Sequence, residues 1–141
     1  MSNLTTAIQM AAEAHHGQVD KAGEPYILHP LRVMLAQDGE VAMIVGVLHD
    51  IVEDTEYDLT DIAMAGFAPE VTYAIDSVTR REGEDYFAYV HRAAANPIGR
   101  LVKAADLNDN MDPNRRPAND NNYETRMAKY EEALSIIGGY A

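Results

Sequence analysis

Apolar side chains recur at every third or fourth position through most of this sequence, a spacing that is typical of amphipathic helices. The first such stretch begins after a cap at Asn3 or Thr5 and ends at Gly17. Residues 17–30 and 112–122 are rich in Gly, Pro and Asn and are predicted to be loops. Further helices are predicted over 30–37, about 40–54, 60–65, 69–78 and 86–95, from Asn96-Pro97 onward, and from Tyr123 to Gly138-Gly139.

The same spacing predicts the fold class. No segment alternates β-branched and polar residues between hairpin turns, so no sheet is expected. No internal repeat or domain boundary interrupts the chain. We therefore expect one all-α domain, residues 1–141, of about six to eight helices.

Charge narrows the class of partner. The chain has 141 residues, 47% of them hydrophobic, so one sizeable core is feasible. Its 11 basic and 23 acidic residues give a formal net charge of −12, which repels a nucleic-acid backbone. No nucleic-acid partner is expected. A small phosphorylated ligand would need a local island of Lys, Arg or metal charge, so the few basic residues are informative.

The composition also bears on where the protein works. The chain contains no Cys, which excludes disulfides and thiolate metal sites and fits a reducing cytoplasm. No apolar stretch approaches the roughly 20 residues of a membrane span. The N-terminus lacks the basic and apolar segments of a signal peptide. We expect a soluble, cytoplasmic protein without a membrane partner, and the sequence makes no prediction about its oligomeric state.

Chemistry concentrates in the segment LHDIVEDT, which follows the apolar run Val41–Leu48. Because residues four apart share a helix face, a continuous helix would set His49 over Glu53 and Asp50 over Asp54. Buried ionisable groups are costly unless they are paired or bound to a metal. The segment therefore offers metal ligands beside a carboxylate that can act on water. A solvated acidic helix end with a chance histidine is the alternative, and these residues alone do not decide between the two.

Similar side chains stand at the ends of two other predicted elements. His29 precedes Pro30, which disfavours the α conformation and fixes the approach of the imidazole at a helix start. Asp106 ends an apolar helical stripe, and Asn110 lies four residues further on the same face. A site of two imidazoles and two carboxylates suits Mn, Fe, Co or Zn and leaves positions for water and a phosphate oxygen. The candidate ligands are His29, His49, Asp50 and Asp106.

Three motifs, AHHGQVDKAGEPYILHP, LHDIVEDT and VKAADLNDN, resemble in this order those of the HD-domain hydrolases of the RelA/SpoT type, most of all the stand-alone small alarmone hydrolases. The segment TRREGEDYFAYVHRAAANP is similar to the one that joins the second and third motifs. The resemblance runs from about Ala14 to Tyr130, most of the chain.

This resemblance implies an all-α HD-domain bundle that holds one Mn²⁺ ion. It implies that Glu53 and Asp54 act on the attacking water. It also implies removal of the 3′-pyrophosphate from guanosine tetra- and pentaphosphate, which gives GDP or GTP and pyrophosphate. The ligands that it implies are His29, His49, Asp50 and Asp106.

Substrate contacts are implied at Lys21, Arg126 and Tyr130, positions where the family binds its nucleotide. Arginine suits bidentate binding of phosphate, and tyrosine offers a ring and a hydroxyl. Asn110 is a candidate for a hydrogen bond to ribose or phosphate. The alternatives are a core position for Tyr130 and solvated surface charge for Lys21 and Arg126.

The remaining arginines and histidines are predicted to have mostly structural or solvent roles. Further candidates for a phosphate contact are Arg80, Arg81, Arg115 and Arg116, although arginine in a polar loop is more often only solvated. His15 lies on the apolar face of the first helix and is expected to be buried and hydrogen-bonded.

One departure from the family pattern concerns the substrate. Many alarmone hydrolases have Arg directly before the loop Lys, where this chain has Asp20. A carboxylate does not stack as a guanidinium does, and it repels phosphate. An adenosine alarmone or another nucleotide therefore stays open as substrate, as does a non-catalytic nucleotide-binding module. With no synthetase domain after Ala141, synthesis of the alarmone is not expected.

Overall fold

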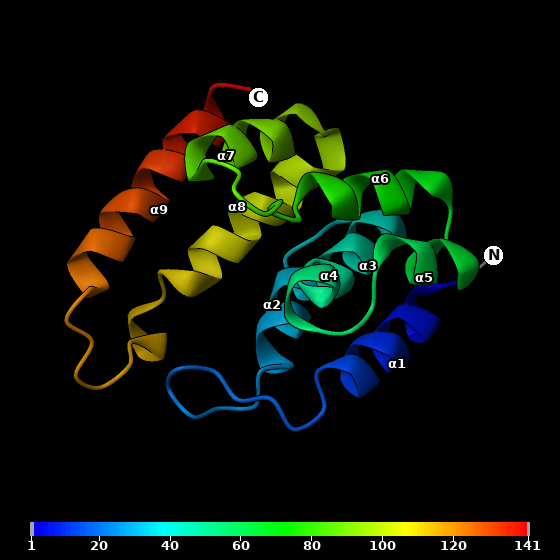
Figure 1. Ribbon diagram of the computed structural model, residues 1–141, viewed down its shortest axis with the longest axis horizontal. Helices are drawn as coiled ribbons and strands as arrows, with labels where there is room; N and C mark the ends of the chain where they lie inside the picture. Colours follow the sequence, from blue (N-terminus) through cyan, green and yellow to red (C-terminus); the bar gives the residue numbers. More distant parts are fainter. Residues whose placement is uncertain (1, 141) are drawn as a thin grey trace.

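In the computed structural model, which describes residues 2–140, the chain is built from helices (Figure 1). Within these residues there is no β-strand, only an isolated bridge between Val19 and Pro25. The predicted all-α fold is confirmed. The helices are α1 (Leu4–Ala14), α2 (Leu28–Leu35), α3 (Glu40–Leu48), α4 (Ile51–Asp54), α5 (Leu59–Met64), α6 (Pro69–Ser77), α7 (Tyr86–Ala95), α8 (Pro97–Asn110), the short 3₁₀ helix η1 (Pro113–Arg115) and α9 (Tyr123–Gly138).

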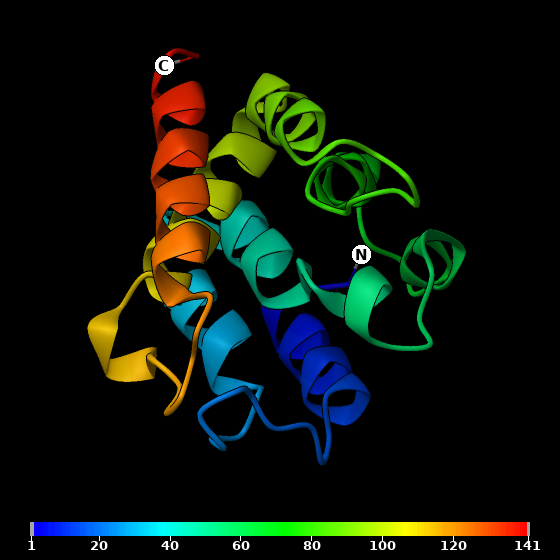
Figure 2. The same cartoon turned by 60° about the vertical axis from the view of Figure 1, so that its left-hand side comes forward.

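Helix α3 forms the centre of the main core. It packs against α1, α2, α6 and α8, and Figure 2 shows it enclosed by these neighbours. Its segment 44–48 is buried on all sides, which is the pattern of an interior helix. The helix that carries the candidate chemistry at its C-terminal end is therefore held from several directions.

Helices α2 and α3 pack closely, backbone against backbone. A Cβ added at Gly46 would lie 3.0 Å from Cα of Met34 and 3.3 Å from the carbonyl oxygen of Val33. Only a residue without a side chain allows this contact between the two helix backbones. The contact fixes the separation of the two helices at whose first turn and C-terminal end His29 and His49 lie.

A second, smaller core joins α7, α8 and α9. The apolar side of α9 enters it through Ala133 and Ile137, and Tyr130 packs at its edge. The predicted bounds of α7 are confirmed, with Asp85 capping its first turn by accepting from the N–H of Ala88. Asn3 is the cap of α1, where its side chain accepts from the N–H of Thr6.

The prediction of one continuous helix over 40–54 is wrong. The helix is interrupted at His49-Asp50, and α4 begins at Ile51. The carbonyl oxygen of Gly46, which a continuing helix would offer to the N–H of residue 50, accepts a hydrogen bond of 2.6 Å from Nδ1 of His49. The interruption turns the acidic pair of α4 relative to α3.

The predicted conformation of His29 is also wrong. His29 and Pro30 both lie in the first turn of α2, which begins at Leu28. The first turn of a helix needs no intrahelical N–H donors, so proline is tolerated there. The N–H of His29 donates to the carbonyl oxygen of Tyr26 at 3.0 Å, which starts the turn before the proline.

The two long loops lie at the same edge of the molecule. One joins α1 to α2 and the other joins α8 to α9, and both occupy the lower edge in Figures 1 and 2. Among residues 2–140, no helix combines the length and the apolar character needed to cross a membrane.

Candidate functional site

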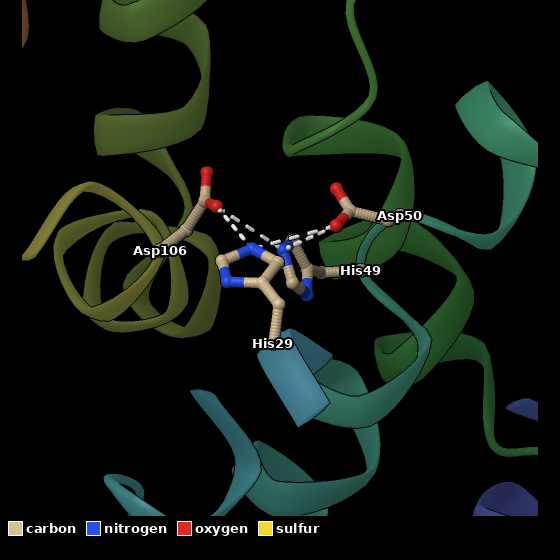
Figure 3. A group of neighbouring side chains, drawn as sticks. All are labelled: His29, His49, Asp50 and Asp106. Carbon is tan, nitrogen blue, oxygen red and sulfur yellow. Dashed lines mark hydrogen bonds and ion pairs between the residues drawn. The ribbon is translucent and has the colours of Figure 1, made fainter. Parts of the chain in front are cut away.

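Four side chains from three parts of the fold point toward one another (Figure 3). His29 comes from α2, His49 and Asp50 from the junction of α3 and α4, and Asp106 from α8. Each offers one ligand atom, and these atoms all lie within 4.8 Å of one another. His29, His49 and Asp106 are buried. The structure thus brings together the four residues that the sequence predicts as a set, and we call them the four-residue cluster.

Hydrogen bonds at the outer ring nitrogens orient both imidazoles. Nδ1 of His49 donates to the Gly46 carbonyl at 2.6 Å, and Nδ1 of His29 donates to Oδ2 of Asp109 at 2.6 Å. Each Nε2 therefore faces the cluster, 2.9 Å (His29) and 3.3 Å (His49) from Oδ1 of Asp106. A lone pair facing a carboxylate oxygen needs a proton or a cation between them. This donor set fits a divalent cation.

The electrostatics of the cluster favour ionised carboxylates. Burial favours the neutral form of Asp106, but Lys103 and the two histidines outweigh it and hold the pKa of Asp106 well below its usual range. Nζ of Lys103 donates to Oδ2 of Asp106 at 2.8 Å, and both side chains are nearly inaccessible. Burial opposes the charged imidazole of His49, yet Asp50 and Asp106 outweigh it and raise the pKa of His49. A cation would take the place of protons in this cluster.

Tyr26 lies between the cluster and the acidic pair of α4. Its hydroxyl is 2.5 Å from Oδ2 of Asp50 and 3.1 Å from Oδ2 of Asp54. Glu53 is held from the other side, because its carboxylate accepts the backbone N–H of Arg80. Burial and the charge of Asp50 raise the pKa of both Glu53 and Asp54. The two carboxylates predicted to act on water thus lie beside the cluster, with pKa values shifted toward that of a better base.

A cleft of about 240 Å³ opens over the cluster and contains cations. Arg80, Lys103 and Lys129 line it together with Glu53 and Asp54. Nζ of Lys129 lies 4.5 Å from the ring centroid of Tyr86, a cation–π distance. A chain of net charge −12 thus gathers positive charge at the place where an anionic ligand would meet the cluster.

A second cavity, of about 250 Å³, lies between the two long loops and the start of α9. Tyr26, Asn110 and Tyr130 line both this cavity and the cleft, so the two adjoin. We call it the loop pocket, and the wall residues that matter below are Asp20, Lys21, Asn110, Arg115, Arg126 and Tyr130.

All four predicted substrate contacts thus line the loop pocket, two of them already engaged within the protein. Lys21 is exposed and Tyr130 half-buried. Arg126 forms an ion pair with Asp120, with NH1 3.0 Å from Oδ1. The amide of Asn110 is used at both ends: it donates to Asp106 at 3.1 Å and accepts from Arg115 at 2.9 Å.

Sequence reasoning missed several residues that shape this site. Lys103 and Asp109 lie three residues before and after Asp106 on α8, and this helical spacing was a signal that could have found them. Tyr26 lies in a loop, where no periodicity points to it. For Arg115 the solvated alternative is wrong, because its side chain is only 16% exposed and forms ion pairs. His15 is buried as predicted, with Nδ1 2.8 Å from Oε1 of Gln18.

Comparison with curated proteins finds relatives over most of the chain, although no protein-family model matches it. A GTP pyrophosphokinase of Streptomyces coelicolor is 36% identical over 124 residues, which cover 79% of this chain and 14% of that protein. A guanosine-3′,5′-bis(diphosphate) 3′-pyrophosphohydrolase of Aquifex aeolicus is 33% identical over 121 residues, 77% of this chain and 17% of that protein. A protein of the same name from Borreliella burgdorferi is 40% identical over 82 residues, 55% of this chain and 12% of that protein. The chain spans less than a fifth of the length of these relatives.

A solved structure shares the fold. It is described as a metazoan ortholog of SpoT that hydrolyzes ppGpp and plays a role in starvation responses, and it matches with a TM-score of 0.82 and 22% identity. The match covers 97% of this chain and 86% of that one. The sequence relatives support an HD-type domain of the RelA/SpoT family, and the solved structure shows that the fold is shared.

Proposed function

We propose that this protein is a Mn²⁺-dependent phosphohydrolase that removes the 3′-pyrophosphate of guanosine tetra- or pentaphosphate-like alarmones and releases GDP or GTP with pyrophosphate. The observation that carries the proposal is the four-residue cluster, which faces a cleft containing two carboxylates and several cations. Relatives of this chain are named both as hydrolases and as pyrophosphokinases. A cluster of two imidazoles and two carboxylates, beside the further carboxylates of Glu53 and Asp54, suits hydrolysis better than pyrophosphoryl transfer between nucleotides.

The proposed ligands of the cation are His29, His49, Asp50 and Asp106. A bound divalent cation supplies Lewis acidity toward water and phosphate. Asp109 and the Gly46 carbonyl hold the two imidazoles with Nε2 toward the cluster, so the protein fixes both tautomers.

Glu53 and Asp54 are the proposed groups that orient the attacking water and accept its proton. Each is held by a hydrogen bond, Glu53 by the backbone N–H of Arg80 and Asp54 by the hydroxyl of Tyr26. Their raised pKa values make them stronger bases than carboxylates with ordinary pKa values, which favours proton abstraction.

The two adjoining cavities suit the two parts of the substrate. We assign the pyrophosphate to the cleft, where Arg80 and Lys129 offer positive charge, and the nucleoside to the loop pocket. The proposed substrate contacts in the loop pocket are Lys21, Asn110, Arg126 and Tyr130. Asn110 and Tyr130 line both cavities, so they lie where ribose would join base and phosphate.

The test incubates the purified protein with guanosine tetraphosphate and Mn²⁺ and measures GDP and pyrophosphate. Glu53→Gln is expected to lower kcat by about 10²–10⁴-fold. Glu56→Gln is the matched control: this acid lies three residues further, exposed and outside the cleft, and the variant should keep its activity. No GDP at high enzyme concentration would exclude guanosine tetraphosphate as substrate.

A second candidate substrate class follows from Asp20, whose carboxylate lines the loop pocket. An acid there changes which bases and phosphates the pocket accepts. The same assay with adenosine alarmones decides between the two, since the better substrate has the higher kcat/KM.

A further inference from the structure

Two consecutive arginines after α8 have different surroundings. NH1 of Arg115 donates to Oδ2 of Asp109 and to Oδ1 of Asn110, both at 2.9 Å, and NH2 donates to Oδ2 of Asp20 at 3.4 Å. Arg116 is exposed, with its guanidinium carbon 4.1 Å above the ring centroid of a tyrosine. Nε of Arg115 is buried without a hydrogen-bond partner among residues 2–140, a cost that argues against a purely stabilising role.

Asp109 connects Arg115 to the four-residue cluster. Its Oδ2 accepts both NH1 of Arg115 and Nδ1 of His29, and its Oδ1 accepts Nε of Arg32 at 2.7 Å. The bond at Nδ1 fixes the tautomer and the ring plane of His29, and so the direction of Nε2. Arg115 thus meets His29 through Asp109 and also directly, with its NH1 3.3 Å from Nδ1 of His29.

Asp20 holds Arg115 at the other end. Oδ1 of Asp20 accepts the N–H groups of Ala22 and Glu24 at 2.9 and 3.0 Å, which leaves Oδ2 for the guanidinium. Burial favours the neutral carboxyl, but these backbone bonds and Arg115 outweigh it and lower the pKa of Asp20. A braced, ionised acid thus anchors an arginine that forms part of the wall of the loop pocket.

We propose that Arg115 is a positioning residue, anchored by Asp20 and acting on His29 through Asp109, so that one guanidinium shapes the loop pocket and orients a metal-binding imidazole. Asp20 is then a required partner of Arg115. The expected effect of Arg115 on catalysis rests on the proposed function, whereas its expected effect on metal affinity can be measured without substrate.

The test compares Arg115→Met, Asp20→Asn and the double variant, with Arg116→Met as matched control. Mn²⁺ affinity is measured by calorimetric titration without nucleotide, kcat and KM with guanosine tetraphosphate, and folding by urea unfolding. Arg115→Met is expected to weaken Mn²⁺ binding by about 10-fold, the usual effect of losing support behind a metal-binding imidazole, and to lower kcat as well as raise KM. Asp20→Asn should change these quantities in the same direction by less.

The double variant should bind Mn²⁺ no more weakly than Arg115→Met, because the two residues act in one chain of contacts. Arg116→Met should match the unmodified protein. Folded Arg115→Met with unchanged Mn²⁺ affinity would overturn the proposal, and additive losses in the double variant would overturn the anchoring role of Asp20. If Arg115→Met does not fold, Asp20→Asn decides, and unchanged Mn²⁺ affinity there refutes the coupling. Inactive unmodified protein would refute the proposed function alone, since the Mn²⁺ titrations stand without substrate.

Discussion

The four-residue cluster and the loop pocket adjoin, but they are built in different ways. The cluster is supplied by α2, the α3–α4 junction and α8, and its imidazoles are 2% exposed. The loop pocket is formed largely by the α1–α2 and α8–α9 loops, and its two arginines are held by ion pairs nearer the solvent. Helix packing therefore fixes the position of the cluster, whereas loop contacts fix the pocket. A change in the cluster should alter folding and chemistry together, whereas a change in the pocket away from Arg115 and its partners should alter substrate binding alone.

The largest effect is expected for Asp106→Ala. This change removes the acceptor of Lys103, of Asn110 and of both imidazoles. Lys103 would remain as a buried cation without its partner, which costs about 3–5 kcal/mol. Mn²⁺ binding and hydrolysis should be lost, and the urea midpoint should fall. Arg126→Ala in the loop pocket should leave that midpoint unchanged, and equal destabilisation by the two variants would contradict the contrast drawn above.

The next effect concerns the contact of α2 with α3. Gly46→Ala would place a Cβ 3.0 Å from a backbone atom of Met34, so the helices must separate. We expect a loss of about 1–3 kcal/mol in the free energy of unfolding. Mn²⁺ affinity should also fall, because His29 and His49 lie on the two helices. Gly138→Ala is the control, since its Cβ meets nothing within 4 Å. If Gly46→Ala is destabilised but its Mn²⁺ affinity is unchanged, the packing of α2 on α3 does not control the cluster, and this prediction is refuted.

The parts of the site differ in how far they could be predicted from the sequence. The cluster could be predicted because its members lie beside segments with clear apolar spacing and in recognisable motifs. The interruption at His49 could not, because a side chain competing for a backbone carbonyl leaves no trace in hydrophobic spacing. The ion pairs of Arg115 could not be predicted either, because loops have no periodic sequence pattern. A loop arginine that is largely enclosed has the same sequence signal as a solvated one.

A smaller effect is expected for the ion pair of Glu84 and Arg92, which supports the cluster side of the cleft. The Glu84 carboxylate accepts from Arg92, and the Glu84 carbonyl oxygen accepts from the guanidinium of Arg80. The backbone N–H of Arg80 in turn donates to Glu53. Hydrogen bonds from Arg92 lower the pKa of Glu84 to about 2. A depressed carboxyl pKa stabilises the fold above the ordinary pKa of 4.5, and this stability is lost as pH falls toward 2.

After allowance for solvent screening, this loss is about 1–2 kcal/mol between pH 5 and pH 2.5. Glu84→Gln should lose part of this stability already at pH 7 and show a flatter pH dependence in urea unfolding. Glu82→Gln, an exposed acid of the same loop, should behave like the unmodified protein. Parallel pH curves for Glu84→Gln and the unmodified protein would refute the role of the pair.

The smallest effect is expected for Asp120→Asn, in the loop pocket. Asp120 forms an ion pair with the guanidinium of Arg126, a proposed substrate contact, so substrate must compete with Asp120. The pair is near the solvent, where ion pairs are weak, and KM should fall by only about two- to fivefold. kcat, Mn²⁺ affinity and the urea midpoint should not change, because the cluster is untouched. The effect should shrink at high ionic strength.

Glu124→Gln provides the matched control for this last change. It removes the same charge from an exposed position in the first turn of α9, close in sequence to Arg126. If both variants lower KM equally, substrate responds to the general negative potential of the chain, and the specific competition of Asp120 for Arg126 is refuted. If Asp120→Asn alone lowers KM, the loop pocket is a set of cations held by the protein's own carboxylates until substrate displaces them. The four-residue cluster would then differ from the loop pocket, because substrate does not displace its carboxylates from the groups that they contact.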